Sequence, residues 1–558
     1  MSGARLSWRE WLMLALVSLA LFLPGFTSLP PTDRDESRYV VTSNRMIDTG
    51  DIVDLRFQDQ PRYLQPAGIY WLQAISASAF GGAQHDRIWA YRIPSLLGAL
   101  AAVLMTGWLG VYFFGRQAGI AAALLLATCF SLNFEARIAK IDATLLATIT
   151  AAQLALMRAY LEPKVGRWTS AAFWAATGVG LLVKGPLVIL VSGTTIAALL
   201  VWDRKARWLM NLRPQWGPLL TLAIALPWFI AIGVITDGAF YKRSLMKNFL
   251  GKVGTSEQGH KGPPGYHLAL FIAAMWPASL LALRAVGFAW RERATPAIRF
   301  LLCWLVPSWI VFELVATKLP HYVLPTYPAI ALIAAAALFA PQVENKTRSW
   351  VFAFVSLIWL AVSAVVAGLG PALLVREQHV FSFVATSLAV VAFAAACAAL
   401  YFLWRKRFAA TVAAMTVSAL IVWTNMFGVV APKLSGVWLS PRINAEARAI
   451  APCPGARLIT TPYSEPSLVF LYGWNRTVLS PDGATAAADF AAQAQCNVAA
   501  IGAADRATFL SGMAQRGLAV REAGKLQGRN YSNNANLDLT FYVAGAAAAA
   551  PGQGRGAN

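Results

Sequence analysis

Charged and aromatic side chains follow the first apolar segment of the chain at 33–39, with the sequence Asp-Arg-Asp-Glu-Ser-Arg-Tyr. If this stretch is helical, Asp35, Arg38 and Tyr39 lie three and four residues apart on one face. A carboxylate there can act as a general base or orient a hydroxyl, and an arginine can bind phosphate through two hydrogen bonds. The stretch could also simply cap a helix, with Asp33 as the N-cap and an acid three residues later. We predict Asp35 as the catalytic residue, with three substrate contacts after it: Glu36, Arg38 and Tyr39.

Two further charged groups lie at the ends of apolar segments. Lys140 and Asp142 are close together in the sequence, and charges beside apolar runs are costly unless they are paired or reach water. They could form a structural pair or belong to a site. Lys184 precedes Gly185-Pro186, which ends one helix and starts the next. A lysine near a helix N-terminus suits phosphate, although it could also only extend toward water.

Three remaining groups combine basic and aromatic residues. The turn 61–71 carries two prolines, a glycine and Tyr63, and it could line a cavity. The segments 241–267 and 318–325 are rich in Lys, Arg, His and Tyr. We predict substrate contacts at Tyr63, Lys140, Asp142, Lys184, Lys242, Arg243, His260, His267, Lys318, His321 and Tyr322.

The composition indicates an integral membrane protein. Hydrophobic residues make up 58% of the 558 residues, charged residues only 13%, and the mean hydropathy is +0.54. A soluble domain carries about a quarter charged residues. The net charge of +21 lies largely in short loops, which is typical of topology signals and contact with anionic lipids rather than of nucleic-acid binding.

Apolar segments of suitable length predict about thirteen transmembrane helices. The expected spans are 10–28, 92–114, 118–134, 142–160, 169–183, 185–202, 216–235, 267–288, 300–317, 322–340, 349–374, 381–404 and 408–430. With the N-terminus in the cytoplasm, every short inner loop carries Lys or Arg, as the positive-inside rule requires. An odd number of spans then places the C-terminal part outside.

The expected fold is a polytopic α-helical membrane protein with a small C-terminal α/β domain. We predict a transmembrane domain over 1–431, with outer loops 29–91 and 236–266, an outer α/β domain over 432–544 and a disordered tail over 545–558. In the α/β domain, strands are expected at 456–461, 498–501 and 537–543, helices at 485–495 and 505–515, and a strand or short helix at 467–472. Cys453 and Cys496 could form a disulfide if this domain is outside the cytoplasm, but the sequence leaves this open.

The outer face therefore gathers one carboxylate, Asp35, and several cations. This combination suits a donor that carries phosphate. Soluble nucleotide sugars belong to the cytoplasm, so a donor used outside should be linked to a lipid. A polyprenyl-phosphate sugar is the substrate that this hypothesis favours.

The order of these motifs resembles the polytopic glycosyltransferases of the GT-C fold. The nearest branch contains the 4-amino-4-deoxy-L-arabinose lipid A transferases and bacterial relatives of protein mannosyltransferases. The resemblance rests on 33–39, 63–71, Lys140-Ile141-Asp142, Lys184-Gly185-Pro186, 260–267, 318–325 and the tail segment 463–470, which contains Glu465. One departure is Leu64-Gln65-Pro66, where the branch usually has Glu-Lys-Pro, so Lys140 or Lys184 would have to contact the donor phosphate instead.

The resemblance implies an inverting transferase of the bacterial inner membrane, with its site and C-terminal domain facing the periplasm. The donor would be a sugar on undecaprenyl phosphate, and the acceptor lipid A, another glycolipid or a protein. Asp35 would be the key carboxylate and Arg38 a phosphate or donor contact. The lysine of the Lys-Gly-Pro motif falls on Lys184 and the tyrosine after Lys-Leu-Pro-His on Tyr322, and Glu465 would be a further substrate contact. We expect a monomer among membrane lipids that binds no nucleic acid and needs no cofactor, a divalent metal being optional. No metal ligands are predicted.

Two other functions fit less well. A transporter of lipid-linked sugars should have polar or broken helices near the midplane and two similar halves, and the sequence shows no such repeat. A scaffold protein would leave Asp35 and its neighbouring cations without a role.

Overall fold

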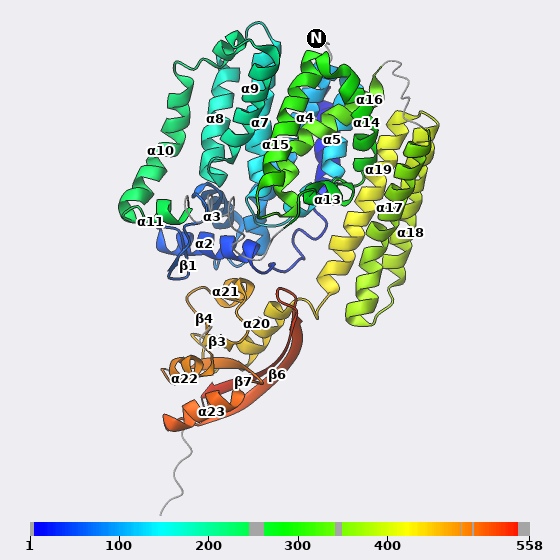
Figure 1. The fold of residues 1–558 in the computed structure, drawn as a ribbon. Coiled ribbons are helices and arrows are strands. Elements are labelled where there is room, and N and C mark those ends of the chain that lie inside the picture. Colours follow the sequence, from blue (N-terminus) through cyan, green and yellow to red (C-terminus); the bar gives the residue numbers. More distant parts are fainter. Residues whose placement is uncertain (1–4, 245–261, 341–348, 481–482, 494–495, 545–558) are drawn as a thin grey trace, which may run out of the picture. The chain divides into compact units, whose positions relative to one another are not determined.

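The computed structural model describes residues 5–244, 262–340, 349–480, 483–493 and 496–544 (Figure 1). The chain folds as two compact units. The first unit, here the membrane unit, contains residues 1–29 and 46–432, and the second, here the C-terminal unit, contains residues 30–45 and 433–558. The segment that carries Asp35 thus packs with the C-terminal part of the chain, and the two units are described separately below. The predicted tail 545–558 and His260 lie outside the described residues.

The membrane unit is a bundle of helices with one short hairpin, β1 (Arg56–Phe57) and β2 (Gln60–Pro61). Its helices are α1 (Trp8–Phe22), α3 (Gly68–Phe80), α4 (Ile88–Phe114), α5 (Arg116–Thr128), α6 (Phe130–Glu135), α7 (Asp142–Leu161), α8 (Arg167–Lys184), α9 (Leu187–Asp203), η1 (Arg207–Leu212), α10 (Gly217–Ile235), α11 (Ala239–Tyr241), α13 (Tyr266–Ala274), α14 (Ser279–Arg291), η3 (Glu292–Ala294), α15 (Pro296–Leu314), η4 (Pro320–Thr326), α16 (Tyr327–Phe339), α17 (Ser349–Gln378), α18 (Phe383–Trp404), α19 (Phe408–Trp423) and η5 (Thr424–Val430).

Each apolar segment expected to span a membrane is helical over most of its length. Among the described residues, eight helices are long and apolar enough to cross a membrane, which makes this a multi-pass membrane protein. The count of thirteen crossings stays a prediction. Two of the expected spans are interrupted: α6 follows α5 after Cys129, and α13 ends before the Trp276-Pro277 bond that precedes α14.

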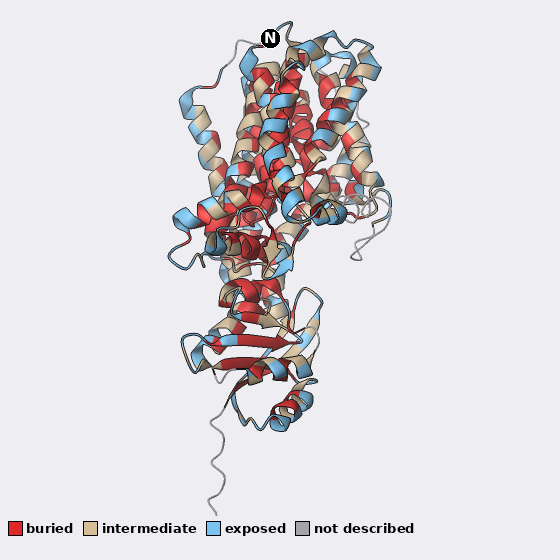
Figure 2. Ribbon diagram, turned by 90° about the vertical axis from the view of Figure 1, so that its left-hand side faces the viewer, coloured by how far each residue is buried: buried red, intermediate tan, exposed pale blue. Residues whose placement is uncertain are grey.

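Burial separates central from peripheral helices in this bundle (Figure 2). In the most apolar stretch of Pro320–Phe339, 83% of the residues are buried, whereas only 22% are buried in Gly217–Ile235. Helix α16 is therefore surrounded by protein, while α10 exposes apolar side chains such as Leu219 and Val234. Such exposed apolar faces are those a lipid environment covers.

The C-terminal unit contains residues 35–45 of α2 (Asp35–Thr49), whose last residues belong to the membrane unit, and an α/β fold. Its sheet has the order β4-β3-β5-β7-β6, with β4 and β5 parallel to β3, and β7 antiparallel to β5 and β6. The strands are β3 (Arg457–Thr461), β4 (Thr477–Leu479), β5 (Asn497–Gly502), β6 (Val520–Asn530) and β7 (Ala535–Ala544), and the helices are α20 (Leu439–Ile450), α21 (Pro466–Tyr472), α22 (Ala484–Ala492) and α23 (Arg506–Gln515).

Both faces of this sheet are covered, because successive side chains of a strand point to opposite faces. Leu458 packs in one core with residues of α20 and α21, such as Ile443 and Leu468. The next residue, Ile459, packs in the other core, with α22 and with Phe509 of α23. The segment 467–472, which the sequence left open between strand and helix, is helical.

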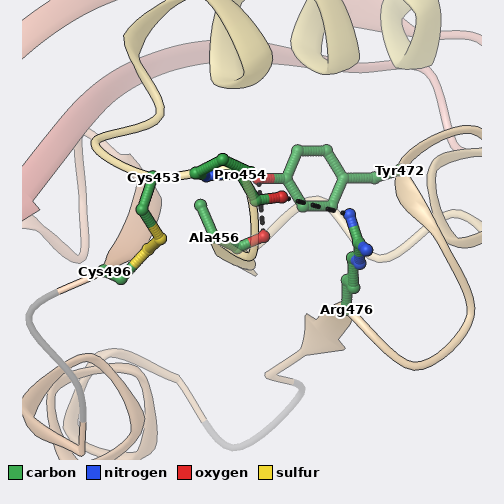
Figure 3. Close-up of a disulfide and its surroundings, with 6 residues drawn as sticks. All are labelled: Cys453, Pro454, Ala456, Tyr472, Arg476 and Cys496. Carbon is green, nitrogen blue, oxygen red and sulfur yellow. Dashed lines mark hydrogen bonds between the residues drawn. A yellow bond between two sulfur atoms is a disulfide. The ribbon is translucent and has the colours of Figure 1, made fainter.

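The two cysteines of this unit, Cys453 and Cys496, form a disulfide with their Cα atoms 5.9 Å apart (Figure 3). The bond joins the segment after α20 to the start of β5. Beside it, Tyr472 donates a hydrogen bond to the carbonyl of Ala456 and Arg476 donates one to the carbonyl of Pro454. The disulfide that the sequence left open is thus present in the structure.

Candidate active site

A cluster of charged side chains lies where several helices of the membrane unit begin or end. Glu135 ends α6, Lys140 lies in the following turn, and Asp142 begins α7. Lys184 ends α8, and His321 lies in η4. We call these five residues the charged cluster.

The distances within the charged cluster place each lysine against a carboxylate. Lys184 Nζ donates to Asp142 Oδ1 at 2.5 Å. Lys140 Nζ lies 3.3 Å from Glu135 Oε1 and 3.7 Å from Asp142 Oδ2. The imidazole of His321 lies between the two acids, with Nδ1 3.5 Å from Glu135 Oε1 and Nε2 3.6 Å from Asp142 Oδ2. Lys140 and Asp142 were expected to form a structural pair or to belong to a site. The structure supports pairing, in a group that is larger than a simple ion pair.

Most of the charged cluster is buried, and a buried charge is costly unless it is paired. Glu135 is 1% exposed and Asp142 7% exposed, and Lys184 keeps 14% of its side chain exposed. Burial raises the pKa of Glu135, and the nearby Lys140 lowers it. Its second oxygen, Oε2, is buried and has no hydrogen-bond partner among the described residues. A buried acceptor without a partner is uncommon in folded proteins and needs an explanation.

Close helix packing fixes the turn that carries Lys140. Gly98 of α4 lies so near the start of α7 that a Cβ there would be 2.8 Å from the carbonyl oxygen of Ala143. Ser95 of α4 donates to the carbonyl of Lys140 at 2.9 Å, and Gln73 of α3 donates to the carbonyl of Ala139 at 3.1 Å. The backbone of the turn is therefore held from two sides.

Lys184 has a different helix environment from the one we expected. It is the last residue of α8, followed by Gly185 at φ +65°, and α9 begins only at Leu187. Its charge therefore complements the C-terminal end of a helix dipole rather than extending the N-terminal end of the next helix. Its Nζ also lies 5.6 Å from the ring centroid of Tyr322, so two residues that were predicted separately as substrate contacts lie against each other.

The side chain of His267, on α13, binds α15 and the segment before η4, and it is not a member of the charged cluster. Its side chain is fully buried, with Nδ1 3.0 Å from Glu313 Oε2 of α15 and Nε2 3.1 Å from the carbonyl of Leu319. Since a carbonyl only accepts, Nε2 carries a hydrogen. Both ring nitrogens are thus occupied by protein contacts, and the substrate contact predicted at His267 stays a prediction. His267 instead fixes the backbone just before η4, which carries His321.

Other predicted contacts in the membrane unit also have partners in the protein. Lys318 is buried and donates to the carbonyl of Gly262 at 2.9 Å. The hydroxyl of Tyr63 donates to Asp54 Oδ1 at 2.9 Å, and burial raises its pKa to about 12. Arg243 is exposed and donates to the carbonyl of Pro61 at 3.4 Å, while Lys242 is exposed at the end of α11. The structure brings none of these four into the charged cluster.

The residues after the first span belong to the C-terminal unit. Helix α2 begins at Asp35, whose side chain is exposed at the first turn. Glu36 is 1% exposed and accepts hydrogen bonds from Thr32, from the backbone N–H at 2.8 Å and from Oγ1 at 2.9 Å. Glu36 therefore has a structural role at the helix start, and the substrate contact predicted there stays a prediction. Arg38 is half-buried and Tyr39 is buried on the same helix.

Two acids of the C-terminal unit belong to one polar network. Asp33 is not at the cap position that the sequence suggested, because α2 begins at Asp35 and the first helical bond runs from the N–H of Arg38 to the carbonyl of Arg34. The carboxylate of Asp33 instead accepts from Ser467 Oγ. Burial raises the pKa of Asp33 to about 6, the bond from Ser467 lowers it, and the charge of Glu465 raises it further. Glu465 is 8% exposed and accepts from Asn530 Nδ2 at 2.8 Å. The predicted substrate contact at Glu465 is therefore a buried residue that is bound within the protein.

Sequence reasoning missed two acids of the membrane unit, Glu135 and Glu313. Both are isolated carboxylates at the end of apolar segments, and such residues are costly without a partner. That signal would have identified them. Glu135 lies two residues before the motif at 137–142, so it was not among the predicted site residues.

Glu135, Asp142 and His321 could in principle hold a metal ion, since their ligand atoms lie within 4.8 Å of one another. The surrounding charges argue against it. Lys184 already binds Asp142, and Lys140 lies within 3.7 Å of both acids. Two ammonium groups in contact with the ligand oxygens would repel a divalent cation. The arrangement suits an anion better.

The comparisons with known proteins agree with the predicted resemblance. Residues 64–230 match the family model for dolichyl-phosphate-mannose-protein mannosyltransferases. The chain is 29% identical over 310 residues to the undecaprenyl phosphate-alpha-4-amino-4-deoxy-L-arabinose arabinosyl transferase of Erwinia tasmaniensis, a match that spans 54% of each chain. It is 28% identical over 342 residues to that of Yersinia pestis, spanning 59% of this chain and 60% of the relative. The matches thus span little more than half the length of these relatives.

Among solved structures, the chain resembles ArnT from Cupriavidus metallidurans, both bound to undecaprenyl phosphate and in the apo state. The TM-scores are 0.72 and 0.71, over 96% of this chain and 98% of the other. At 19% and 20% identity, this likeness establishes the fold. The chain has the GT-C membrane fold, as the motifs predicted.

Proposed function

We propose that this chain, which shares its fold with ArnT, transfers a sugar from a polyprenyl-phosphate donor to an acceptor outside the cytoplasm, such as lipid A. The charged cluster is the observation that carries this proposal. It brings two lysines, two acids and a histidine together at helix ends within a membrane unit. Undecaprenyl phosphate is bound by the structurally similar ArnT, and the similar relatives are named for aminoarabinose transfer from that lipid.

The charge change during such a reaction explains the lysines. The donor is a phosphodiester with one negative charge. When the bond between the anomeric carbon and the phosphate oxygen breaks, the leaving polyprenyl phosphate gains a second charge. An ammonium group about 4 Å away stabilises that extra charge by about 4 kcal/mol at an effective dielectric constant of about 20. Cations placed there before the reaction favour the transition state over the ground state.

Lys184 is the cation we assign to this role. Its ammonium group has three N–H donors, and the bond to Asp142 uses one of them. Asp142 and the ring of Tyr322 hold the side chain in place. Lys140, with the partner Glu135, contributes a second cation and replaces the lysine that is absent at Gln65.

The acceptor determines what Asp35 does. A phosphate acceptor is already an anion and needs no strong base, so Asp35 would orient it or balance charge. A hydroxyl acceptor must lose its proton as the new bond to the anomeric carbon forms, and Asp35 would then accept the proton. In both cases the new bond forms on the face opposite the leaving phosphate, which inverts the anomeric configuration.

We place the reaction on the periplasmic side of a bacterial inner membrane. The positive-inside pattern supports this orientation. The Cys453–Cys496 disulfide supports it independently, because such bonds persist in the periplasm and are rare in the cytoplasm.

Transfer by purified protein in proteoliposomes, with a polyprenyl-phosphate sugar as donor, tests the proposal. We expect Lys184→Met to lower kcat by about 10²–10³-fold, the usual effect of removing one charge-stabilising group. Lys184→Arg keeps the charge and should lose less. Asp35→Asn should also lower transfer, by a factor that depends on whether the acceptor is a hydroxyl.

Lys164→Met is the matched control. Lys164 is an exposed lysine between α7 and α8, at the ends of these helices opposite Asp142 and Lys184. It should transfer at the unmodified rate. If folded Lys184→Met and Asp35→Asn proteins both transfer as fast as this control, the proposal is wrong.

A further inference from the structure

The segment between the first span and Arg45 is bound to the C-terminal part of the chain at both ends of its helical stretch. At the start, the backbone N–H of Asp33 donates to the hydroxyl of Tyr531 at 2.6 Å, and Arg34 Nη2 donates to the carbonyl of Ser532 at 2.6 Å. Further along α2, the guanidinium of Arg45 lies 5.7 Å from the ring centroid of Trp474. These contacts join residues more than 400 positions apart in the sequence.

A chain of hydroxyl groups supports the contact at Asp33. Ser467 Oγ donates to the Asp33 carboxylate, and the Ser467 and Ser440 hydroxyls are 2.6 Å apart. The Ser440 and Tyr463 hydroxyls are also 2.6 Å apart. Each hydroxyl has one hydrogen, so once Ser467 donates to Asp33, Ser440 must donate to Ser467 and Tyr463 to Ser440. The carboxylate therefore orders three hydroxyls that lie on different elements.

Most of this network is closed to solvent. Ser440, Ser467 and Tyr463 are 2%, 1% and 1% exposed. Buried polar networks of this kind define one arrangement strongly when every member has a partner. Tyr531, at the turn between β6 and β7, also packs its ring against Trp438 before α20, with ring centroids 6.0 Å apart.

We infer that the C-terminal domain is the element that positions α2 and its Asp35, and that Asp33, Ser467 and Tyr531 are positioning residues for sugar transfer. Asp35 follows Asp33 by two residues and is itself exposed. Its backbone is therefore held by contacts on the residues just before it, while its carboxylate stays accessible. The attachment of α2 follows from these contacts alone. The effect of the three residues on sugar transfer rests on the proposed function as well.

Tyr531→Phe in the full-length protein tests this inference with little disturbance. It removes only the hydroxyl that accepts from Asp33 and leaves the ring against Trp438. Loss of one hydrogen bond costs about 1 kcal/mol. We expect amide hydrogen exchange in residues 33–45 to become roughly three- to tenfold faster. Ser467→Ala should have the same effect, and Ser467→Thr, which keeps the hydroxyl, should restore protection.

Tyr472→Phe is the matched control. Its hydroxyl also makes a hydrogen bond within the C-terminal unit, to the carbonyl of Ala456 at 3.0 Å, but it does not contact α2. Exchange in 33–45 should stay unchanged in this variant. Unchanged exchange in Tyr531→Phe and Ser467→Ala would overturn the inference whatever their activity.

Transfer kinetics then distinguish residues that position Asp35 for sugar transfer from residues that only attach α2. A positioning role predicts that Tyr531→Phe lowers kcat while the KM for the donor changes little, and that Tyr472→Phe changes neither. Faster exchange with an unchanged kcat would refute the positioning role. If the unmodified protein shows no transfer at all, the proposed function fails, and the exchange data still test the attachment of α2.

Discussion

Lys184 and Lys140 are paired with acids before any substrate is present. With both acids charged and His321 neutral, the charged cluster has no net charge, which makes its burial tolerable. A donor phosphate would share the ammonium group of Lys184 with Asp142, whose bond occupies one of the three N–H donors. The leaving group would carry more charge than the intact donor, so this ammonium group would stabilise it more strongly.

Asp33 should give the C-terminal unit a specific pH dependence. Its pKa is raised to about 6 in the folded protein, from an ordinary value of 3.8, mainly by burial and partly by the charge of Glu465. Between these values the folded state holds the proton more often than the unfolded state. Stability from this group is therefore fully present below about pH 4 and is lost as the pH rises through about 6.

The measurement is the difference between the unfolding curves of the unmodified protein and Asp33→Asn from pH 4 to 7.5. The unmodified protein should lose stability relative to the variant as the pH rises. Tyr463 and Tyr531 face the same carboxylate, but they stay protonated over this range because burial raises the pKa of each tyrosine far above it. Parallel curves would contradict the burial of a charged Asp33.

The approach of α4 to α7 explains a glycine that the sequence did not single out. A Cβ at Gly98 would be 2.8 Å from the carbonyl oxygen of Ala143 and from the backbone of Thr144. Gly98→Ala should therefore push the start of α7 and the adjacent Asp142 out of place, lowering both thermal stability and transfer. Real Cβ atoms do not come this close to backbone atoms.

Gly193→Ala on α9 is the matched control, because a Cβ there meets no atom within 4 Å. Alanine is the better helix former, by about 1 kcal/mol, so this variant should be as stable as the unmodified protein or more stable. If Gly98→Ala behaves like Gly193→Ala, the close packing around Asp142 is not required.

The Cys453–Cys496 disulfide should contribute strongly to the C-terminal unit. It closes a loop of 43 residues, and cross-links of this kind stabilise proteins by about 2–4 kcal/mol. We expect Cys453→Ser/Cys496→Ser to lower the free energy of unfolding of this unit by that amount. Reductant should destabilise the unmodified protein and leave the double variant unchanged. An unmodified protein insensitive to reductant would show that the bond is absent.

The apolar helices and three of the described strands, β3, β5 and β7, were predictable because their signals are local. The apolar segments gave the bundle, and the strands at 457–461 and 497–502 follow from short apolar runs between helices. Strand β6 was missed because Val520–Asn530 carries several charged residues and has only two fully buried positions, Leu526 and Asn530. It is an edge strand, held by β7 alone.

The site was predictable only in part because contacts between distant segments decide it. The structure brings four of the predicted contacts into one cluster, namely Lys140, Asp142, Lys184 and His321, and Tyr322 lies against Lys184. Their role in substrate binding stays a prediction. His267, Lys318 and Glu465 had the same signal, a polar residue in an apolar or aromatic setting, but each binds a partner that no local pattern reveals. Leu319 and Gly262 offer only backbone carbonyls, which every residue has.

The two units of the chain differ in physical character. The membrane unit holds the buried charged cluster among apolar helices. The C-terminal unit is a disulfide-linked α/β fold that holds the segment with Asp35. The chain order of the units is interleaved, since residues 30–45 belong with 433–558. Removal of the C-terminal part would therefore remove the partners of residues 30–45.

The fate of the donor in proteoliposomes distinguishes a transferase from a transporter. The unmodified protein, given a polyprenyl-phosphate sugar and an acceptor, should release one polyprenyl phosphate for each sugar that appears on the acceptor. Mass spectrometry of the extracted lipids measures both products. Intact donor that moves across the bilayer, with no polyprenyl phosphate released, would contradict a transferase and identify a transporter instead.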